Sequence, residues 1–310
     1  MIRTKDFWET IIKRYLTEEI SLTQLGKEYK IDRRTLSSNL KKLGVDIVNK
    51  QNTPKFNENV FDEINTEEKA YWLGFIFADG YISNNDLCIY KNVFEISLKL
   101  ADVEQLNKFN VFMNHIKNNV KTDDYRCRWA VMNSHLWNQL NSYGCVPNKS
   151  LKLTFPDKSI FKDIELIRHF IRGYFDGDGC ITFHKYKYVV SPAISVIGTK
   201  RFLETIIEIS NISAKFRHDS RHSDNTFSLE YDKENGINFI NWLYSDCSIF
   251  LNRKYELYNF FKNGSRSIQE WTEWLSTKNG ELCDENTVVT EENKKSSAPY
   301  SVETEPDLSE

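Results

Sequence analysis

The 310-residue chain contains no hydrophobic run close to the roughly 18 residues that a membrane span requires. Charged residues occupy its N-terminus with no apolar segment behind them, so no secretory signal is predicted. The six cysteines form no C-x-x-C pair, which argues against a zinc site or a dithiol motif. We therefore expect a reduced, intracellular, cytoplasmic protein with no membrane partner.

Several catalytic signatures are missing as well. The sequence has no G-x-S-x-G, no Walker A loop and no G-x-G-x-x-G, and its six histidines show no H-E-x-x-H spacing. These absences argue against the hydrolase, nucleotide-binding and metalloprotease classes that carry such motifs. Apolar residues are plentiful, however, at 40% of the chain with 20 Phe, 15 Tyr and 7 Trp. Such a composition can bury a substantial core, so wholesale disorder is not expected.

Charge is distributed unevenly along the chain. The formal net charge is −3, but the segment Ser276–Glu310 alone carries three Lys against nine acidic residues. Residues 1–55 hold twelve Lys and Arg against seven acidic residues. A basic N-terminal segment, a mildly basic body and an acidic tail fit a polyanionic partner better than the net charge does.

The N-terminal segment is predicted to form three short helices, at Lys5–Leu16, Leu22–Tyr29 and Arg33–Leu43. Ser21 and Asp32 occupy N-cap positions, and Gly44 follows the third helix. The inward face of the third helix is expected to carry Leu36, Leu40 and Leu43.

A tight turn before a basic third helix is typical of a helix-turn-helix. We accordingly predict a DNA-binding domain over residues 1–50, with DNA contacts from Arg33, Arg34, Ser37 and Lys41. The alternative is a small helical cap that packs on the body without touching nucleic acid.

Residues 51–65 are rich in Asn and contain Pro54, so they are predicted to be a linker. Residues 66–262 form a body with two repeats, at about 66–150 and 163–262. The segment 263–310 is predicted to be an acidic and disordered tail, apart from one helix-like patch at Trp271, Trp274 and Leu275.

Each repeat opens with a nearly all-apolar helix that ends in Asp-Gly, one at Ala70–Gly80 and one at His169–Gly179. Alternating stretches such as Phe94–Leu100 follow, and further helices separate the strand pairs. Each half therefore reads helix–strand–strand–helix–strand–strand–helix. We predict an α+β fold with pseudo-twofold symmetry, in which each sheet has one buried and one polar face.

Small residues lie four apart on both Asp-Gly helices, at Gly74 and Ala78 and at Gly173 and Gly177. Such stripes permit two helices to approach closely, and the apolar remainder predicts burial nearly all round. Packing along the stripes would bring Asp79 and Asp178 together, with Gly80 and Gly179 as left-handed caps.

Two neighbouring carboxylates at helix C-termini oppose the helix dipoles and repel each other. Divalent cations between them would remove both costs, and oxygen ligands without His or Cys favour Mg²⁺.

The segments Trp72–Gly80 and Ile171–Gly179 resemble the two motifs of the LAGLIDADG homing endonuclease family in its single-chain form. The resemblance covers roughly Glu67–Phe261. It implies a saddle of two antiparallel sheets along duplex DNA, with the acidic pair over the minor groove and both strands cut with Mg²⁺. It further implies that the metals are bound by Asp79, Asp178 and the carbonyls of Ala78 and Gly177. The first motif departs from the pattern at Phe77, where the second has Asp176; we interpret Asp176 as structural.

A basic residue stands late in each half, at Lys149 and at Lys254. The resemblance implies that these lysines lie beside the scissile phosphates. A lysine there could neutralise developing charge or organise the attacking water, so both are predicted to be catalytic. The alternative is a solvated lysine at a loop–helix junction.

DNA contacts in the body are assigned to basic residues on the polar strand faces. They are Lys99, Arg126 and Arg128 in the first half, and Lys185, Lys187, Arg217 and Arg221 in the second. The prediction as a whole is a monomeric, nucleoid-associated, Mg²⁺-dependent homing endonuclease that cuts double-stranded DNA at a specific site, acting in intron homing or standing free. The alternatives are a non-cleaving DNA-binding regulator on the same scaffold and an intron maturase that binds intron RNA.

Overall fold

The computed structural model describes residues 4–18, 20–45, 56–149, 152–218, 225–278 and 288–289. The chain divides into two compact units, Met1–Phe56 and Asn57–Glu310. Each unit has its own core and is considered separately.

The first unit consists of three helices, α1 (Lys5–Thr17), α2 (Leu22–Glu28) and α3 (Arg33–Lys42). The predicted N-caps are confirmed. The Ser21 side chain accepts a hydrogen bond from the Gln24 backbone N–H and completes a capping box. Asp32 accepts hydrogen bonds from the N–H groups of Arg34 and Thr35. These caps fix where α2 and α3 begin, on either side of a short turn.

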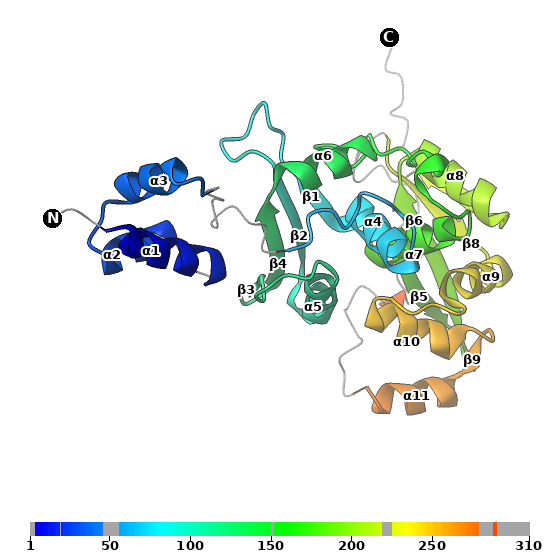
Figure 1. The fold of residues 1–310 in the computed structure, drawn as a ribbon. Coiled ribbons are helices and arrows are strands. Elements are labelled where there is room, and N and C mark those ends of the chain that lie inside the picture. The colour runs from blue at the N-terminus through cyan, green and yellow to red at the C-terminus, as the bar shows by residue number, and fades with distance from the viewer. Residues whose placement is uncertain are drawn as a thin grey trace, which may run out of the picture. The chain divides into compact units, whose positions relative to one another are not determined.

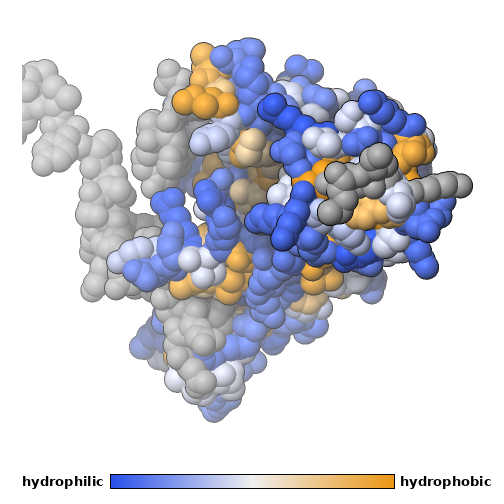
Figure 2. Space-filling model, turned by 60° about the vertical axis from the view of Figure 1, so that its left-hand side comes forward, coloured by the Kyte–Doolittle hydropathy of each residue, from blue (hydrophilic) through white to orange (hydrophobic). Residues whose placement is uncertain are grey.

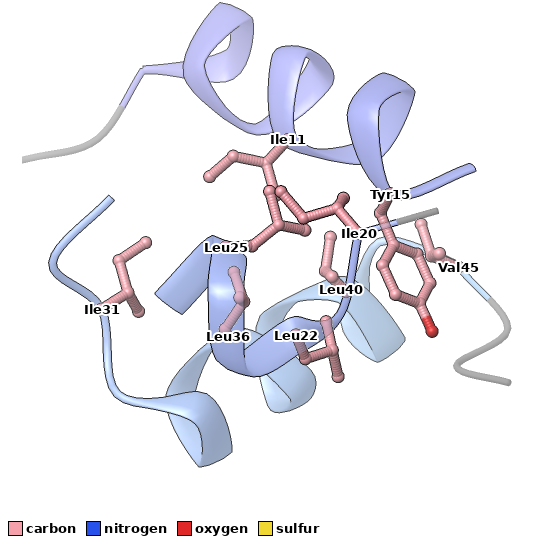
Figure 3. Close-up of a cluster of buried hydrophobic side chains, with 9 residues drawn as sticks. All are labelled: Ile11, Tyr15, Ile20, Leu22, Leu25, Ile31, Leu36, Leu40 and Val45. Atoms are coloured by element: carbon pink, nitrogen blue, oxygen red, sulfur yellow. The ribbon is translucent and has the colours of Figure 1, made fainter. Parts of the chain in front are cut away.

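The three helices enclose a small apolar core, which Figure 3 shows with side chains from all three helices converging. Leu36 and Leu40 of α3 are fully buried, as expected. Leu43 is 51% exposed, so the expectation that it faces inward was wrong. It lies past the last turn of α3 as the C-cap residue, where the chain leaves the helical path and Gly44 takes a left-handed φ of 76°.

The second unit contains the predicted duplication (Figure 1). The first half comprises α4 (Glu67–Asp79), β1 (Gly80–Ile82), β2 (Val93–Lys99), α5 (Val103–Phe112), β3 (Val120–Thr122), β4 (Arg126–Met132) and α6 (Ser134–Ser142). The second half comprises α7 (Leu166–Asp178), β5 (Gly179–Lys185), β6 (Val189–Gly198), α8 (Lys200–Ser210), β7 (Lys215–His218), β8 (Phe227–Tyr231) and α9 (Lys233–Tyr244). Short 3₁₀ turns lie at Leu100–Asp102 and Lys158–Ile160.

The two sheets repeat one strand order. The first runs β1-β2-β4-β3, and the second contains β5-β6-β8-β7, all paired antiparallel. At one edge of the second sheet, β10 (Val288–Val289) lies parallel to β5, and β9 (Arg266–Ser267) pairs with the first residues of the inner strand β6. The α+β class and the helix–strand–strand order of both halves are thus confirmed.

Helices α4 and α7 pack side by side along their small residues, between the two sheets (Figure 1). A Cβ atom on Gly74 would lie 1.9 Å from the Phe170 carbonyl oxygen, and one on Gly173 would lie 1.9 Å from that of Tyr71. The backbones therefore touch directly at these two points. Residues 70–77 of α4 are all buried, as their apolar composition predicted.

Gly80 and Gly179 are not the left-handed caps that the sequence predicted. Both have negative φ, −75° and −91°, and both begin a strand directly after the helix. Glycine is required there for a different reason. A Cβ atom would lie 2.6 Å from the Ile76 carbonyl oxygen at Gly80, and 2.5 Å from that of Phe175 at Gly179. The chain turns from helix to strand too tightly for a side chain.

Two boundaries of the second unit differ from the prediction. Residues 57–65 were expected in the linker, but Val60, Phe61 and Ile64 are buried in the core of this unit. At the other end, α10 (Asn252–Phe261) is followed by α11 (Ile268–Ser276), whose Trp271 side chain is buried. Most of the predicted disordered tail lies outside the described residues, as do residues 51–55 of the predicted linker.

Hydrophilic residues cover most of the surface visible in Figure 2, with apolar patches scattered among them. Across the described ranges, we find no helix with the length and apolar character needed to cross a bilayer.

The close approach of α4 and α7 predicts that Gly173→Ala destabilises the second unit severely, by more than about 3 kcal/mol, because the methyl group would overlap backbone atoms. Gly236→Ala in α9 is the matched control, since its nearest contacts are side-chain atoms of Ile194. Chemical denaturation of both variants measures the difference. Equal midpoints for the two variants would contradict the backbone contact.

Candidate active site

The two predicted acids lie at the centre of the second unit. Asp79 is the last residue of α4 and Asp178 is the last residue of α7, and each is followed at once by the first strand of its sheet. A Cβ atom on Gly177 would lie 2.3 Å from Ala78 Cβ and 2.8 Å from Asp79 Oδ2. The Asp79 carboxylate therefore lies in direct contact with the last turn of α7.

Both acids have a raised pKa. Burial and the neighbouring Asp178 carboxylate raise the pKa of Asp79 to about 6. The pKa of Asp178 is also raised, first by burial, although Lys149 and Lys254 act in the opposite direction. The fold thus holds two half-buried carboxylates together at a free-energy cost, as the sequence predicted.

Both predicted lysines reach this centre. Lys149 Nζ donates a hydrogen bond of 2.7 Å to the Ala78 carbonyl oxygen. Lys254, from the first turn of α10, is 2% exposed and donates to the carbonyl oxygens of Phe175, Asp176 and Gly179 at 2.6, 2.8 and 2.5 Å. Burial and the nearby Arg253 lower its pKa to about 8. Each lysine places a positive charge at the C-terminus of one motif helix, where the dipole favours it.

Asp176, two residues before Asp178, is fully buried. Its carboxylate accepts hydrogen bonds from Tyr71 Oη at 2.7 Å, from Tyr244 Oη at 2.5 Å and from the Leu251 backbone N–H at 2.7 Å. These contacts agree with its interpretation as a structural residue.

A buried ion pair between the motif helices was not predicted from the sequence. Arg172 of α7 is fully buried and donates to Glu67 of α4 at 2.7 Å and to the Ile249 carbonyl oxygen at 3.0 Å. Glu67 also accepts from the Ser248 backbone N–H at 2.8 Å. A charged residue in the middle of an otherwise apolar helix was the signal that could have revealed it.

The polar face of the first sheet carries the predicted basic residues. Lys99, Arg126 and Arg128 are all exposed, and Lys99 lies directly opposite Arg126 on the neighbouring strand. Lys121 of β3, which was not predicted, lies opposite Arg128. Like charges directly opposite each other destabilise a sheet. Arg128 also forms an ion pair of 3.5 Å with Glu95.

The second sheet places its basic residues differently. Arg217 is exposed on the polar face but forms an ion pair of 3.1 Å with Glu230. Lys215, which was not predicted, shares this face with Arg217 because the two are separated by one residue. Strands β3 and β7 are too short for their alternation to have revealed Lys121 and Lys215 from the sequence.

The placement of Lys185 on the polar face was wrong. Lys185 pairs with the buried Val190 and shares the face of Phe183, and its Nζ lies 5.7 Å from the centres of the Phe183 and Trp271 rings. Lys187 lies in the turn between β5 and β6, over the Tyr188 ring. Arg221 lies outside the described residues.

In the first unit, Arg33, Arg34 and Lys41 are exposed on α3 and Ser37 is half-buried. The four residues lie on the helix that was predicted to meet DNA. Whether they do so stays a prediction.

The donor set at the acidic centre fits a hard divalent cation, because it offers two carboxylates and the backbone carbonyls beside them. It contains no imidazole or thiolate that would favour zinc. Over the described residues there is no group of three or more His, Cys, Asp and Glu side chains that could hold a metal. Any cation here would therefore depend on Asp79 and Asp178 together with backbone oxygens and water.

No protein-family model matches this chain, and no curated protein matches it. Among solved structures, it is similar to the meganuclease I-SmaMI bound to uncleavable DNA, at 11% identity over 62% of this chain and 90% of the other, with a TM-score of 0.42. It is also similar to the LAGLIDADG homing endonuclease I-GzeII in complex with its DNA target (14% identity, 73% and 94% coverage, TM-score 0.39). A third is the LAGLIDADG meganuclease I-AabMI bound to uncleaved DNA (13% identity, 69% and 93% coverage, TM-score 0.43).

The raised pKa of Asp79 predicts a pH-dependent stability in the absence of divalent cations. A folded-state pKa of about 6, above the unfolded value of 3.8, means that the folded protein binds this proton more tightly. Stability is therefore lost as pH rises from about 4 through 6. We expect Asp79→Asn to raise the free energy of unfolding at pH 7.5 by about 2 kcal/mol, and to have little effect at pH 4.

Thermal unfolding in EDTA at the two pH values measures this effect. Asp86→Asn, which alters an exposed carboxylate, is the control and should change neither value. A destabilised Asp79→Asn protein at pH 7.5 would contradict the predicted repulsion.

Proposed function

We propose that this protein is a site-specific endonuclease that cuts both strands of duplex DNA with Mg²⁺. The single observation that carries the proposal is the pairing of Asp79 and Asp178 at the tips of two helices whose backbones touch. Each acid directly precedes the first strand of its own sheet, so each half of the duplicated scaffold contributes one acid to a shared pair. Two related half-sites suit a substrate with two antiparallel strands.

The proposed binding surface consists of the polar faces of the two sheets. The opposed pairs Lys99–Arg126 and Arg128–Lys121 concentrate positive charge on this face, which phosphate groups would complement. In this proposal the acidic pair faces the minor groove, and Arg217 and Lys187 extend the contact in the second half. Since both half-sites lie on one chain, the protein acts as a monomer.

In the proposed chemistry, Mg²⁺ supplies Lewis-acid stabilisation of the phosphate charge and lowers the pKa of water. Asp79 and Asp178 would hold it, with help from the carbonyl oxygens of Ala78 and Gly177. Burial raises the pKa of both acids, and the Asp178 carboxylate adds to the rise at Asp79, so a bound cation would offset the cost of holding both carboxylates ionised. The positive charge of Lys149 and Lys254 limits that repulsion and adds to the positive potential that a phosphate meets.

A DNA-binding regulator that does not cut is the second candidate, and the N-terminal helices favour it because they offer an independent basic surface. An intron maturase that binds RNA is the third. Neither role requires two acids at the point of contact, where they repel phosphate. The pairing of the acids therefore favours the nuclease.

The proposal predicts that Asp79→Asn and Asp178→Asn each lower cleavage by at least about 100-fold while leaving DNA affinity within a few-fold of the parent. The assay is a plasmid library of candidate insertion sites, incubated with Mg²⁺ or with Ca²⁺ and analysed for linear product and for shifted bands. The Asp86→Asn protein is the matched control and should cut normally. Full cleavage by either active-site variant would refute the mechanism. Binding by the parent with no product in Mg²⁺ would favour the regulator.

The N-terminal unit is proposed to contact DNA phosphates through α3. Exchanging Arg33 and Arg34 together for Gln should then reduce the slope of log affinity against log salt by about 2, with little change in the cleavage rate of bound DNA. The control exchanges the exposed Lys13 and Lys27 for Gln, which removes equal charge from α1 and α2. Equal slopes for the two double variants would exclude α3 as the contact surface.

A further inference from the structure

The two lysines of the site are held in unequal ways. A lysine ammonium group has three N–H donors and no acceptor. Lys254 donates to three carbonyl oxygens, those of Phe175, Asp176 and Gly179, at 2.5–2.8 Å. Its side chain is almost completely buried. Lys254 therefore cannot donate to a substrate phosphate unless it first gives up a hydrogen bond inside the protein.

The helix that carries Lys254 is itself fixed at its start. The Asp176 carboxylate accepts the backbone N–H of Leu251, the N-cap residue of α10, at 2.7 Å. Asp176 thus holds the beginning of α10, while Lys254 of α10 holds the carbonyl groups on both sides of Asp178. Asp176 of α7 thus accepts a hydrogen bond from the start of α10, and Lys254 of α10 donates hydrogen bonds to the backbone at the end of α7. Together these contacts hold the two helix ends against each other. We call this set, Asp176, Leu251 and Lys254, the α10 clamp.

Residues of the first half also form an ion pair and a hydrogen bond with the first turn of α10, which further fixes its position. Arg253 forms an ion pair with Asp102 at 3.0 Å, and Lys108 of α5 donates to Asn252 Oδ1 at 2.6 Å. Gln105 of α5 donates to Tyr71 Oη at 2.7 Å, and Tyr71 donates to Asp176. The clamp is therefore part of the contact between the two halves.

Among the described residues of the first half, no equivalent clamp surrounds Lys149. Phe77 occupies the position of Asp176 and packs edge-on against the Phe170 ring, with 5.1 Å between ring centres. Lys149 follows α6 and is half-buried. Among the described residues, its ammonium group donates one hydrogen bond, to the Ala78 carbonyl oxygen. Two of its three donors remain for other groups.

We propose that the lysines have different roles: Lys149 donates to substrate phosphate as a catalytic residue, whereas Lys254 is a positioning residue that fixes the backbone around Asp178. This inference rests on the proposed function. It follows that the two strands are cut at unequal rates. The cut served by Lys149 is the faster one, and nicked DNA accumulates before linear DNA.

Single-turnover cleavage of a duplex with differently labelled strands tests this, together with thermal unfolding of the protein without DNA or metal. Lys149→Met should slow one strand by about 100-fold and leave the melting temperature within about 2 °C of the parent. Lys254→Met should lower the melting temperature by at least about 5 °C. It should also slow both strands by the same factor, so that the ratio of the strand rates is kept.

Asp176→Asn provides a second variant in case Lys254→Met does not fold. It should lower the melting temperature and slow both strands equally, because it loosens the start of α10 while Lys254 stays in place. A merely structural residue would reduce the fraction of active protein, which active-site titration measures, without changing the rate per active molecule.

The proposal is overturned if Lys254→Met slows one strand alone at an unchanged melting temperature, since Lys254 would then act on phosphate as Lys149 does. Equal rates for both strands in the parent also overturn it. If the parent cuts no duplex in the library, the proposed function fails. The unfolding comparison then decides on its own whether the two lysines are held unequally.

Discussion

The second unit depends on the direct contact between the backbones of α4 and α7. At Gly74 and Gly173 there is no room for even a methyl group, so the two helices share one crossing point with little freedom to shift. Each helix runs straight into the first strand of its own sheet. The crossing point therefore determines where both sheets begin and where both helix-terminal acids lie.

This geometry concentrates negative charge in a confined space. The two acids lie at the negative ends of their helix dipoles. Burial raises the pKa of both, and the Asp178 carboxylate raises the pKa of Asp79 further. The protein offsets part of that cost with the ammonium groups of Lys149 and Lys254, each at the C-terminus of one motif helix. Two paired carboxylates are unfavourable for folding, and the two lysines neutralise their negative charge only in part. Such pairs are typical of functional sites, where a bound cation would supply the remaining positive charge.

The halves share a topology but not their polar chemistry. A buried carboxylate in the second half organises Tyr71, Tyr244 and the start of α10, whereas a phenylalanine fills the same position in the first half. The basic sheet faces differ too, because the first sheet carries opposed like charges and the second carries Arg217 paired with Glu230. The two halves thus share a backbone frame but differ in the residues that fill it.

The sequence by itself determined the repeat, the order of helices and strands, the α+β class and the meeting of Asp79 with Asp178. These follow from local periodicity and from small residues four apart, which constrain a helix face whatever surrounds it. Only the tertiary structure decided how Lys185, Lys254 and the motif-ending glycines are used. Lys185 was misplaced because a shift of one residue moves a side chain to the opposite face of a strand. The partners of Lys254 come from segments far away in the chain. The motif-ending glycines avoid a steric clash, but in the sequence they look the same as glycines that adopt positive φ. The buried Arg172–Glu67 pair joins residues more than a hundred positions apart. The charge within α7 indicates that Arg172 needs a partner, but it does not identify Glu67.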